Sequence, residues 1–176
     1  MFGSPRKNGY TKALLDELLK NITGYDISII DAYNENIKPC IACGVCEKDD
    51  ICIYNDFDEI DELLRTADLL IIATPVYNLS VPSPLKAIFD RTQRYFSARF
   101  CREVKRPIAK HKRAILLLTS GRDCEFAKEV VEKQIKMMFT IINASLDYTV
   151  FLKNTDKMET TQLPYEEILN IAKELV

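Results

Sequence analysis

Four cysteines stand close together in the segment PCIACGVCEKDDIC, residues 39–52. Cys40, Cys43, Cys46 and Cys52 fall within thirteen residues, although the whole chain has only six cysteines. Gaps of two residues let successive thiolates converge on one small object, and four thiolates match the four irons of a [4Fe–4S] cluster. The spacing therefore favours an iron–sulfur cluster with these four cysteines as its ligands.

Other interpretations of the same cysteines remain open. Zinc also accepts four thiolates, but its usual sites pair two separated knuckles and these ligands are crowded. A dithiol redox site needs one C-x2-C beside a helix start and leaves two cysteines without a role. An empty loop of buried or free thiols is the simplest alternative. Cys101 and Cys124 show no spacing signal, and we interpret them as structural or incidental.

Length and charge narrow the class of protein. A chain of 176 residues suits one domain that buries a sizeable core. The net charge is −2 and 28% of residues are charged, so composition points neither to nucleic acid nor to a membrane surface. The apolar runs are too short to span a bilayer, and the N-terminus has no apolar signal region. We therefore expect a cytoplasmic protein, whose thiols stay reduced.

Strand-like and helix-like segments alternate along the chain. Apolar runs rich in Ile, Leu and Val predict strands at 26–31, 68–75, 113–121 and 144–152. Apolar residues at helical spacing predict helices at 10–22, 57–66, 83–95, 124–140 and 164–175. Asp56, with Glu59 three residues later, is expected to cap the second of these helices. The alternation predicts a doubly wound parallel sheet in a three-layer α/β/α domain over residues 1–176. Long irregular regions, expected to be functional loops, remain at 36–55 and 97–112.

The chain opens with a loop that suits a phosphate group, MFGSPRKNGYTKALL. The start of a helix offers free N–H groups and a partial positive charge, which together bind phosphate. Gly3 and Gly9 permit tight bends, while Arg6 and Lys7 add positive charge. An ordinary capped helix start explains the same residues equally well. This loop alone therefore does not decide between a phosphate site and a simple helix start.

A second loop, in the segment TPVYNLSVPSPLKAIFDR at 74–91, lies between a predicted buried strand and a predicted helix. In doubly wound sheets, ligands bind beyond the carboxyl ends of the strands. Backbone amides and an aromatic ring at that place suit a flat heterocycle with polar edges. Taken alone, a proline-rich turn with a packed tyrosine is the commoner interpretation. Together, the two loops predict one shared ligand.

In their order and spacing, these loops resemble those of the NADPH-dependent FMN reductase family of flavodoxin-like proteins. The cysteine-rich insertion at 38–55 resembles that of the iron–sulfur flavoproteins within this family, and the likeness covers roughly residues 3–120. The resemblance implies FMN phosphate contacts from Ser4, Arg6, Lys7, Asn8, Gly9 and Thr11. It implies isoalloxazine contacts from Pro75, Val76, Tyr77, Asn78 and Ser80. In the third loop on the flavin side, at 119–126, the resemblance implies a contact from Gly121 only.

The sequence departs from the family at its start. Only Met1 and Phe2 precede Gly3, where the flavodoxin strand order 2-1-3-4-5 places an internal strand of about five or six residues. Without that strand, its neighbours lose a ladder partner and leave buried backbone groups unpaired. The first strand is therefore truncated here, and we expect either an upstream segment or another part of the chain to fill its slot.

A strongly basic stretch runs from residue 91 to residue 113. It contains nine lysines and arginines, and Glu103 is its only acid. We interpret it as a solvated loop and helix end. The alternative is a site for a phosphate-rich partner, such as the 2′-phosphate of NADPH, or for an acidic electron carrier.

These patterns predict FMN-dependent electron transfer that links flavin to a [4Fe–4S] cluster. The expected partners are NAD(P)H, a redox protein or a small-molecule acceptor, and the resemblance implies a homodimer or homotetramer in which one subunit's cluster approaches another's flavin. The cofactors supply the chemistry, so no catalytic side chain is assigned. Two alternatives are an NAD(P)H-dependent FMN or quinone reductase without a cluster, and a zinc-stabilised binding domain that is not an enzyme.

Overall fold

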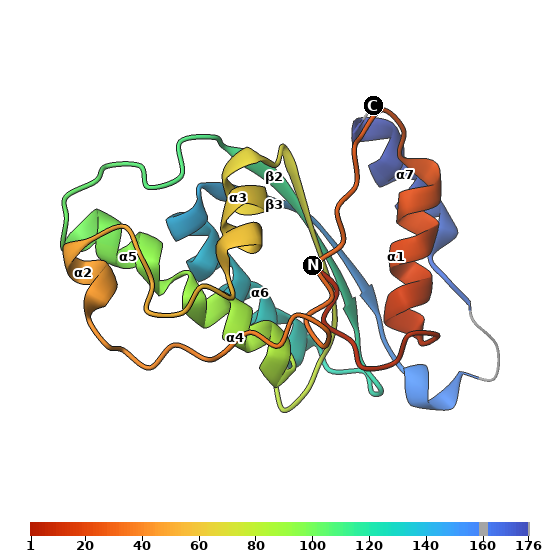
Figure 1. The fold of residues 1–176 in the computed structure, drawn as a ribbon. Helices are drawn as coiled ribbons and strands as arrows, with labels where there is room; N and C mark the ends of the chain where they lie inside the picture. The colour runs from red at the N-terminus through yellow and green to blue at the C-terminus, as the bar shows by residue number, and fades with distance from the viewer. Residues whose placement is uncertain (159–161, 176) are drawn as a thin grey trace.

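A parallel three-stranded sheet forms the centre of the protein in a computed structural model that describes residues 1–158 and 162–175. Its strands lie in the order β1 (Leu69–Pro75), β2 (Lys112–Thr119) and β3 (Ala144–Leu152). Helices α1 (Tyr10–Asn21) and α7 (Tyr165–Leu175) cover one face (Figure 1). The other face is covered by α3 (Asp58–Thr66), α4 (Ser83–Arg91) and α6 (Glu125–Ile142). These layers confirm the predicted α/β/α class.

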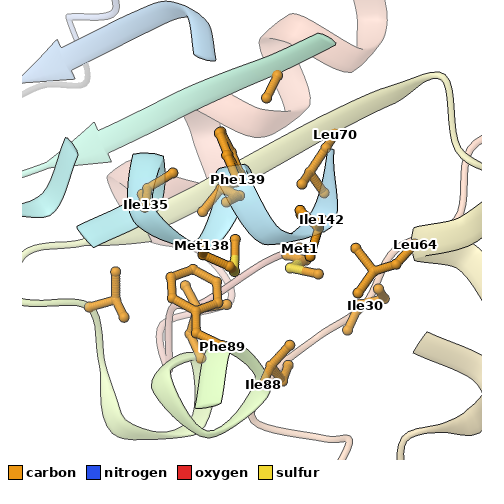
Figure 2. Packing of buried hydrophobic residues seen from close by; sticks show 14 of the residues in the cluster. Met1, Ile30, Leu64, Leu70, Ile88, Phe89, Ile135, Met138, Phe139 and Ile142 are labelled. Atoms are coloured by element: carbon orange, nitrogen blue, oxygen red, sulfur yellow. The ribbon is translucent and has the colours of Figure 1, made fainter. Parts of the chain in front are cut away.

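Both faces of the sheet are buried, which explains why β1 and β2 are continuous apolar runs. Leu70 and Ile72 pack with α3, α4 and α6, in the cluster that Figure 2 shows around Phe89, Met138 and Phe139. Ile71 and Ala73 point the other way, toward the cluster beneath α1 and α7. Burial of one such side chain stabilises the fold by roughly 1.5–3 kcal/mol, so these strands form the core of the molecule.

The helix predicted at 83–95 is two helices. α4 ends at Arg91, and α5 (Gln93–Phe100) begins after Thr92. The Thr92 hydroxyl and N–H both donate to the carbonyl of Phe89, at 2.7 and 3.0 Å, which tightens the last turn of α4 and bends the chain. α5 thus extends into the region that was predicted to be irregular. Two short elements complete the fold, α2 (Val45–Lys48) in the cysteine loop and η1 (Thr155–Lys157).

The prediction of a strand at 26–31 is wrong. Of these residues only Asp31 forms a β-bridge, and its partner is Phe2. Phe2 donates its N–H to Ile30 O at 2.7 Å and accepts from Ala32 N at 2.9 Å, while its neighbours Met1 and Gly3 pair with Ala73 of β1. Residues 26–29 have no such backbone partner within the described chain. Ile27 and Ile29 are accordingly 45% and 54% exposed instead of buried in a sheet.

Met1–Gly3 lie between the segment 26–31 and β1, where the missing first strand would run. Beyond Met1 this strand slot is a cavity of about 480 Å³. Its walls are apolar side chains of α1 and α3 and the backbone of both edges. Backbone N–H groups along β1 point alternately toward β2 and away from it. Those of Leu69 and Ile71 point away from β2 and so face this cavity. The Met1 amino group lies at its end and donates to Ile71 O at 2.7 Å, and burial lowers the pKa of this amine from 8.0 to about 5.

An apolar strand added ahead of Met1 is expected to stabilise the fold. Six alternating valines and isoleucines would pair with both edges and bury side chains in the cavity, raising Tm by about 5–10 °C. A glycine–serine extension of equal length is the control, since it adds the backbone without the apolar side chains. Equal melting temperatures for the unextended protein and the two extended ones, measured by calorimetry, would contradict the interpretation of this cavity as a strand slot.

For a chain that starts at Met1, the buried amine also predicts a specific pH dependence. Its pKa is lower in the folded protein than in the unfolded chain, so the unfolded chain binds the proton more readily between pH 8 and 5. The free energy of unfolding should therefore fall as pH falls through this window, by up to about 4 kcal/mol. The valine–isoleucine extension replaces the amine by an amide and should lose this component. Urea unfolding of both proteins at pH 8 and 5.5 measures the difference, and parallel pH profiles would refute the assignment.

Candidate functional site

Three loops meet at the carboxyl end of the sheet, as the strand pairing requires. Pro75 at the end of β1 lies opposite Thr119 at the end of β2, so the loops that follow them start side by side. The first loop joins them because Gly3 donates its N–H to Ala73 O at 2.8 Å. A Cβ on Gly3 would lie 2.5 Å from Leu85 Cδ2, so only glycine lets this loop pack directly on α4.

The first loop leads into α1 with its helix start open. Gly9 is the N-cap and supplies no side-chain hydrogen bond, and the first turn of α1 contains no acidic residue. The N–H groups and partial positive charge at this end are therefore free to hold an anion. Ser4 is buried and accepts a hydrogen bond from Arg6 N at 3.2 Å, whereas Arg6 and Asn8 are exposed. This arrangement supports the predicted phosphate site.

Two of the predicted phosphate residues have other contacts in the protein. The buried hydroxyl of Thr11 lies 2.7 Å from that of Thr119, which ties α1 to the end of β2. Lys7 pairs with Asp31 and lies 5.2 Å from the centre of the Phe2 ring. Arg6 has no ion-pair partner in the described part of the chain, so it is the better candidate for a direct phosphate contact.

The second loop turns tightly at the end of β1. Tyr77 and Ser80 exchange backbone hydrogen bonds of 2.8 and 2.9 Å, and Asn78 and Leu79 between them have φ of 49° and 60°. A leucine in this left-handed region is strained by about 1–2 kcal/mol, so neighbouring contacts must hold the turn. Val76 N donates to Thr119 O at 2.8 Å. Ser80 Oγ donates to Gln134 of α6 at 3.0 Å.

Tyr77 presents its side chain to solvent at this edge. It is 45% exposed, which disagrees with the alternative of a turn around a packed tyrosine. Tyr33 lies nearby and is a residue that the sequence analysis missed. Burial and the neighbouring Tyr77 raise the pKa of the Tyr33 phenol, and Lys7 lies 5.9 Å from its ring centre. Its position just after the predicted strand 26–31 was the signal that could have identified it.

Gly121 has a structural reason to be glycine. A Cβ there would lie 2.3 Å from Asp156 Oδ2, so the residue lets η1 pack against the loop after β2. Asp156 N also donates to Gly121 O at 3.2 Å. The predicted contact of Gly121 with flavin stays a prediction.

The four clustered cysteines line one cavity of about 260 Å³, together with Arg91, Gln93, Arg94 and Ser97 from α4 and α5. All four are free thiols, with Cys40 and Cys43 exposed and Cys46 and Cys52 half-buried. Within the described residues, no three Cys, His, Asp or Glu side chains are close enough to hold a metal ion as they stand. The donor set fits an iron–sulfur cluster, but the loop must close around it, as metal binding to a flexible loop commonly requires.

Arg91, at the end of α4, holds both ends of the cysteine loop. It donates to Lys38 O at 3.0 Å before the loop, and to Tyr54 O at 3.2 Å and Asp56 Oδ1 at 2.6 Å after it. Its side chain is 2% exposed. Burial alone would raise the pKa of Asp56, but hydrogen bonds from Lys38 N–H and Arg91 and the charge of Arg91 hold it below its ordinary value. The loop base is thus fixed by an ion pair between buried Arg91 and half-buried Asp56.

Two sequence predictions fail at this place. Asp56 does not cap α3, whose N-cap is Phe57 without a side-chain bond, because Lys38 N and Arg91 occupy its carboxylate. The basic stretch is not simply solvated either. Arg91 and Arg94 are buried, and Arg94 and Arg102 both hold Asp50 of the cysteine loop, Arg94 through the carbonyl at 2.8 Å and Arg102 through the carboxylate at 3.0 Å.

Solved structures of similar shape define the fold class as flavodoxin-like. An NAD(P)H:quinone oxidoreductase from Methanothermobacter marburgensis matches with a TM-score of 0.64 and 17% identity, over 98% of this chain and 90% of that one. An FMN-dependent NADH-azoreductase from Bacillus anthracis, solved in complex with FMN, matches with a TM-score of 0.63 and 16% identity, over 97% and 92%. No helix within the described residues is long and apolar enough to cross a membrane.

The model of the family described as NADPH-dependent FMN reductase matches residues 1–146, so the chain belongs to this family of flavin-dependent oxidoreductases. An iron–sulfur flavoprotein from Methanosarcina thermophila is 40% identical over 93 residues, 51% of this chain and 49% of that protein. The iron–sulfur flavoprotein MJ0731 from Methanocaldococcus jannaschii is 30% identical over 145 residues, 79% and 68%. The chain spans about half the length of most of the curated relatives it matches. The family resemblance is confirmed.

Replacing Arg6 by alanine is expected to weaken FMN binding about tenfold, because a charge-assisted phosphate contact contributes roughly 1.5–3 kcal/mol. Lys20→Ala, at the far end of α1, is the matched control and should leave the affinity unchanged. Titration of the flavin-free proteins by quenching of flavin fluorescence measures both dissociation constants. Equal affinities for Arg6→Ala and Lys20→Ala would place the phosphate elsewhere.

Proposed function

We propose that the protein is an FMN-dependent oxidoreductase that passes electrons between FMN and a [4Fe–4S] cluster. FMN would lie on residues 4–11 and 75–80, and the cluster on Cys40, Cys43, Cys46 and Cys52. The main support is that the four thiols share one cavity, whose wall is formed by the helices that follow the second loop. The names of the curated relatives agree with this assignment.

FMN takes up electrons in pairs or singly and a cluster one at a time, so the two together would link a two-electron donor such as NAD(P)H to a one-electron acceptor. The chain contributes binding and orientation. The open start of α1 and Arg6 would hold the phosphate, and the turn at 77–80 would present backbone groups to the ring. Tyr77, which is exposed at this edge, would be available to pack against that ring. None of these steps needs a side chain as acid, base or nucleophile.

The two sites are separated along α4. Helix α4 advances ~12 Å from Ser83, just after the flavin loop, to Arg91, at the cysteine cavity. The cavity therefore does not adjoin the flavin loop of the same chain. Both sites face solvent, because Tyr77, Cys40 and Cys43 are exposed. A homodimer or homotetramer would let the cluster of one subunit approach the flavin of another. Six free thiols suit a reducing compartment such as the cytoplasm.

A second candidate is an NAD(P)H-dependent FMN or quinone reductase whose cysteine loop stays empty. The observation in its favour is that no three of these thiols lie close enough together to hold a metal ion in the part of the chain that the structure describes. Steady-state oxidation of NADPH with free FMN or a quinone, at equal rates in the wild type and in Cys43→Ala, would favour this candidate.

Replacing Cys43 by alanine is expected to abolish bound iron while leaving FMN in place, because the two sites use separate loops. Reduction of bound flavin should persist, and electron transfer to a one-electron acceptor such as ferricyanide should slow at least tenfold. Cys101→Ala is the matched control, since Cys101 lies outside the cysteine cavity, and it should behave as the wild type. Equal iron contents and equal rates for the two variants would exclude Cys43 as a ligand.

A further inference from the structure

Arg94 of α5 has a buried hydrogen-bond donor with no acceptor in the described protein. Its side chain is 9% exposed, and Nε–H lacks a partner, while Nη2 donates to Asp50 O at 2.8 Å. Arg94 also lines the cavity that holds the four cysteines. A buried, unpaired N–H costs free energy, so a donor of this kind usually marks a missing polar or charged partner.

The arginines around Arg94 outnumber the carboxylates with which they form ion pairs. Arg65, Arg94 and Arg102 share the two carboxylates of Asp50 and Asp61. Three guanidiniums thus share two carboxylates, and Glu47 on the loop side lines the same cavity. The thiols of this cavity become anionic on binding metal, which adds negative charge beside Arg94.

Ser97 adds a second polar contact on the same face of α5. It is buried, and its Oγ lies 3.5 Å from Cys46 Sγ. As a thiol, Cys46 donates this hydrogen bond to Ser97 Oγ. As a thiolate, it would instead accept a hydrogen bond from the Ser97 hydroxyl. Arg94 and Ser97 are three residues apart on α5, so both face the cysteine cavity.

We propose that Arg94 sets the reduction potential of the group held by the four cysteines, by offsetting its negative charge with a buried guanidinium. The inference rests on the proposed cluster. A cluster with four thiolate ligands is a net anion, and reduction adds one electron and no proton. A fixed buried cation favours the reduced form, because net charge and hydrogen bonds to sulfur tune such potentials. Arg94 is therefore a positioning and tuning residue and not a catalytic one.

The test is a spectroelectrochemical titration of the anaerobic full-length holoprotein. Arg94→Gln should lower the ratio of reduced to oxidised cluster at a fixed potential about tenfold, which equals ~59 mV for one electron. Arg94→Lys keeps the charge and should stay within about threefold of the wild type. The matched control is Arg99→Gln, on the exposed side of the same helix and outside the cavity, and it should not change the ratio. The potential of the bound FMN serves as an internal control and should be constant.

The outcomes separate this inference from the proposed function. Wild-type protein without iron overturns the cluster and, with it, the role of Arg94. Iron in the wild type with an unchanged cluster potential in Arg94→Gln overturns the role of Arg94 alone. If Arg94→Gln holds no iron, Arg94→Lys decides, because a wild-type potential there supports the charge and an unloaded or tenfold-shifted cluster refutes it.

Discussion

The parallel pairing of β1 with β2 is the constraint on which the other features depend. It aligns Pro75 with Thr119, and so brings the loop at 75–80 beside the end of β2 and the start of α1. Thr119 then contacts both loops, through its carbonyl to Val76 N and through its hydroxyl to Thr11. Because both faces of these strands are buried, the edge that carries the loops cannot shift without opening the core.

Two successive helices, α4 and α5, connect that edge to the cysteines (Figure 1). Arg91 at the end of α4 fixes both ends of the cysteine loop. Residues of α5 line the cavity that holds the four cysteines. Arg91 is buried whereas the Asp56 side chain is 22% exposed, so this ion pair is partly buried. Removing Asp56 would leave a buried guanidinium without its charged partner, which is costly, so this base is an anchor. The middle of the loop depends instead on half-exposed Asp50. The loop therefore combines a rigid base with thiols that can still adjust.

Local sequence patterns predicted the parts of the fold that are stabilised locally. The apolar runs of β1 and β2 and the spacing of leucines in α1 identify buried faces directly. Residues 26–31 have the composition of a strand, but a strand also needs a hydrogen-bonded neighbour, and only Phe2 supplies one. Asp56 has the position of a helix cap, yet Arg91, 35 residues away, takes its carboxylate. The site loops were identifiable by type and order, whereas Tyr33, Arg91 and Arg94 depend on contacts between distant segments.

The central claim is that one chain carries both FMN and a [4Fe–4S] cluster. The most direct measurement is the iron, acid-labile sulfide and flavin content of the wild-type protein, purified and reconstituted without oxygen. We expect about four irons and four sulfides for each FMN, with broad visible absorption beneath the flavin bands. Stoichiometric FMN with neither iron nor sulfide would contradict it.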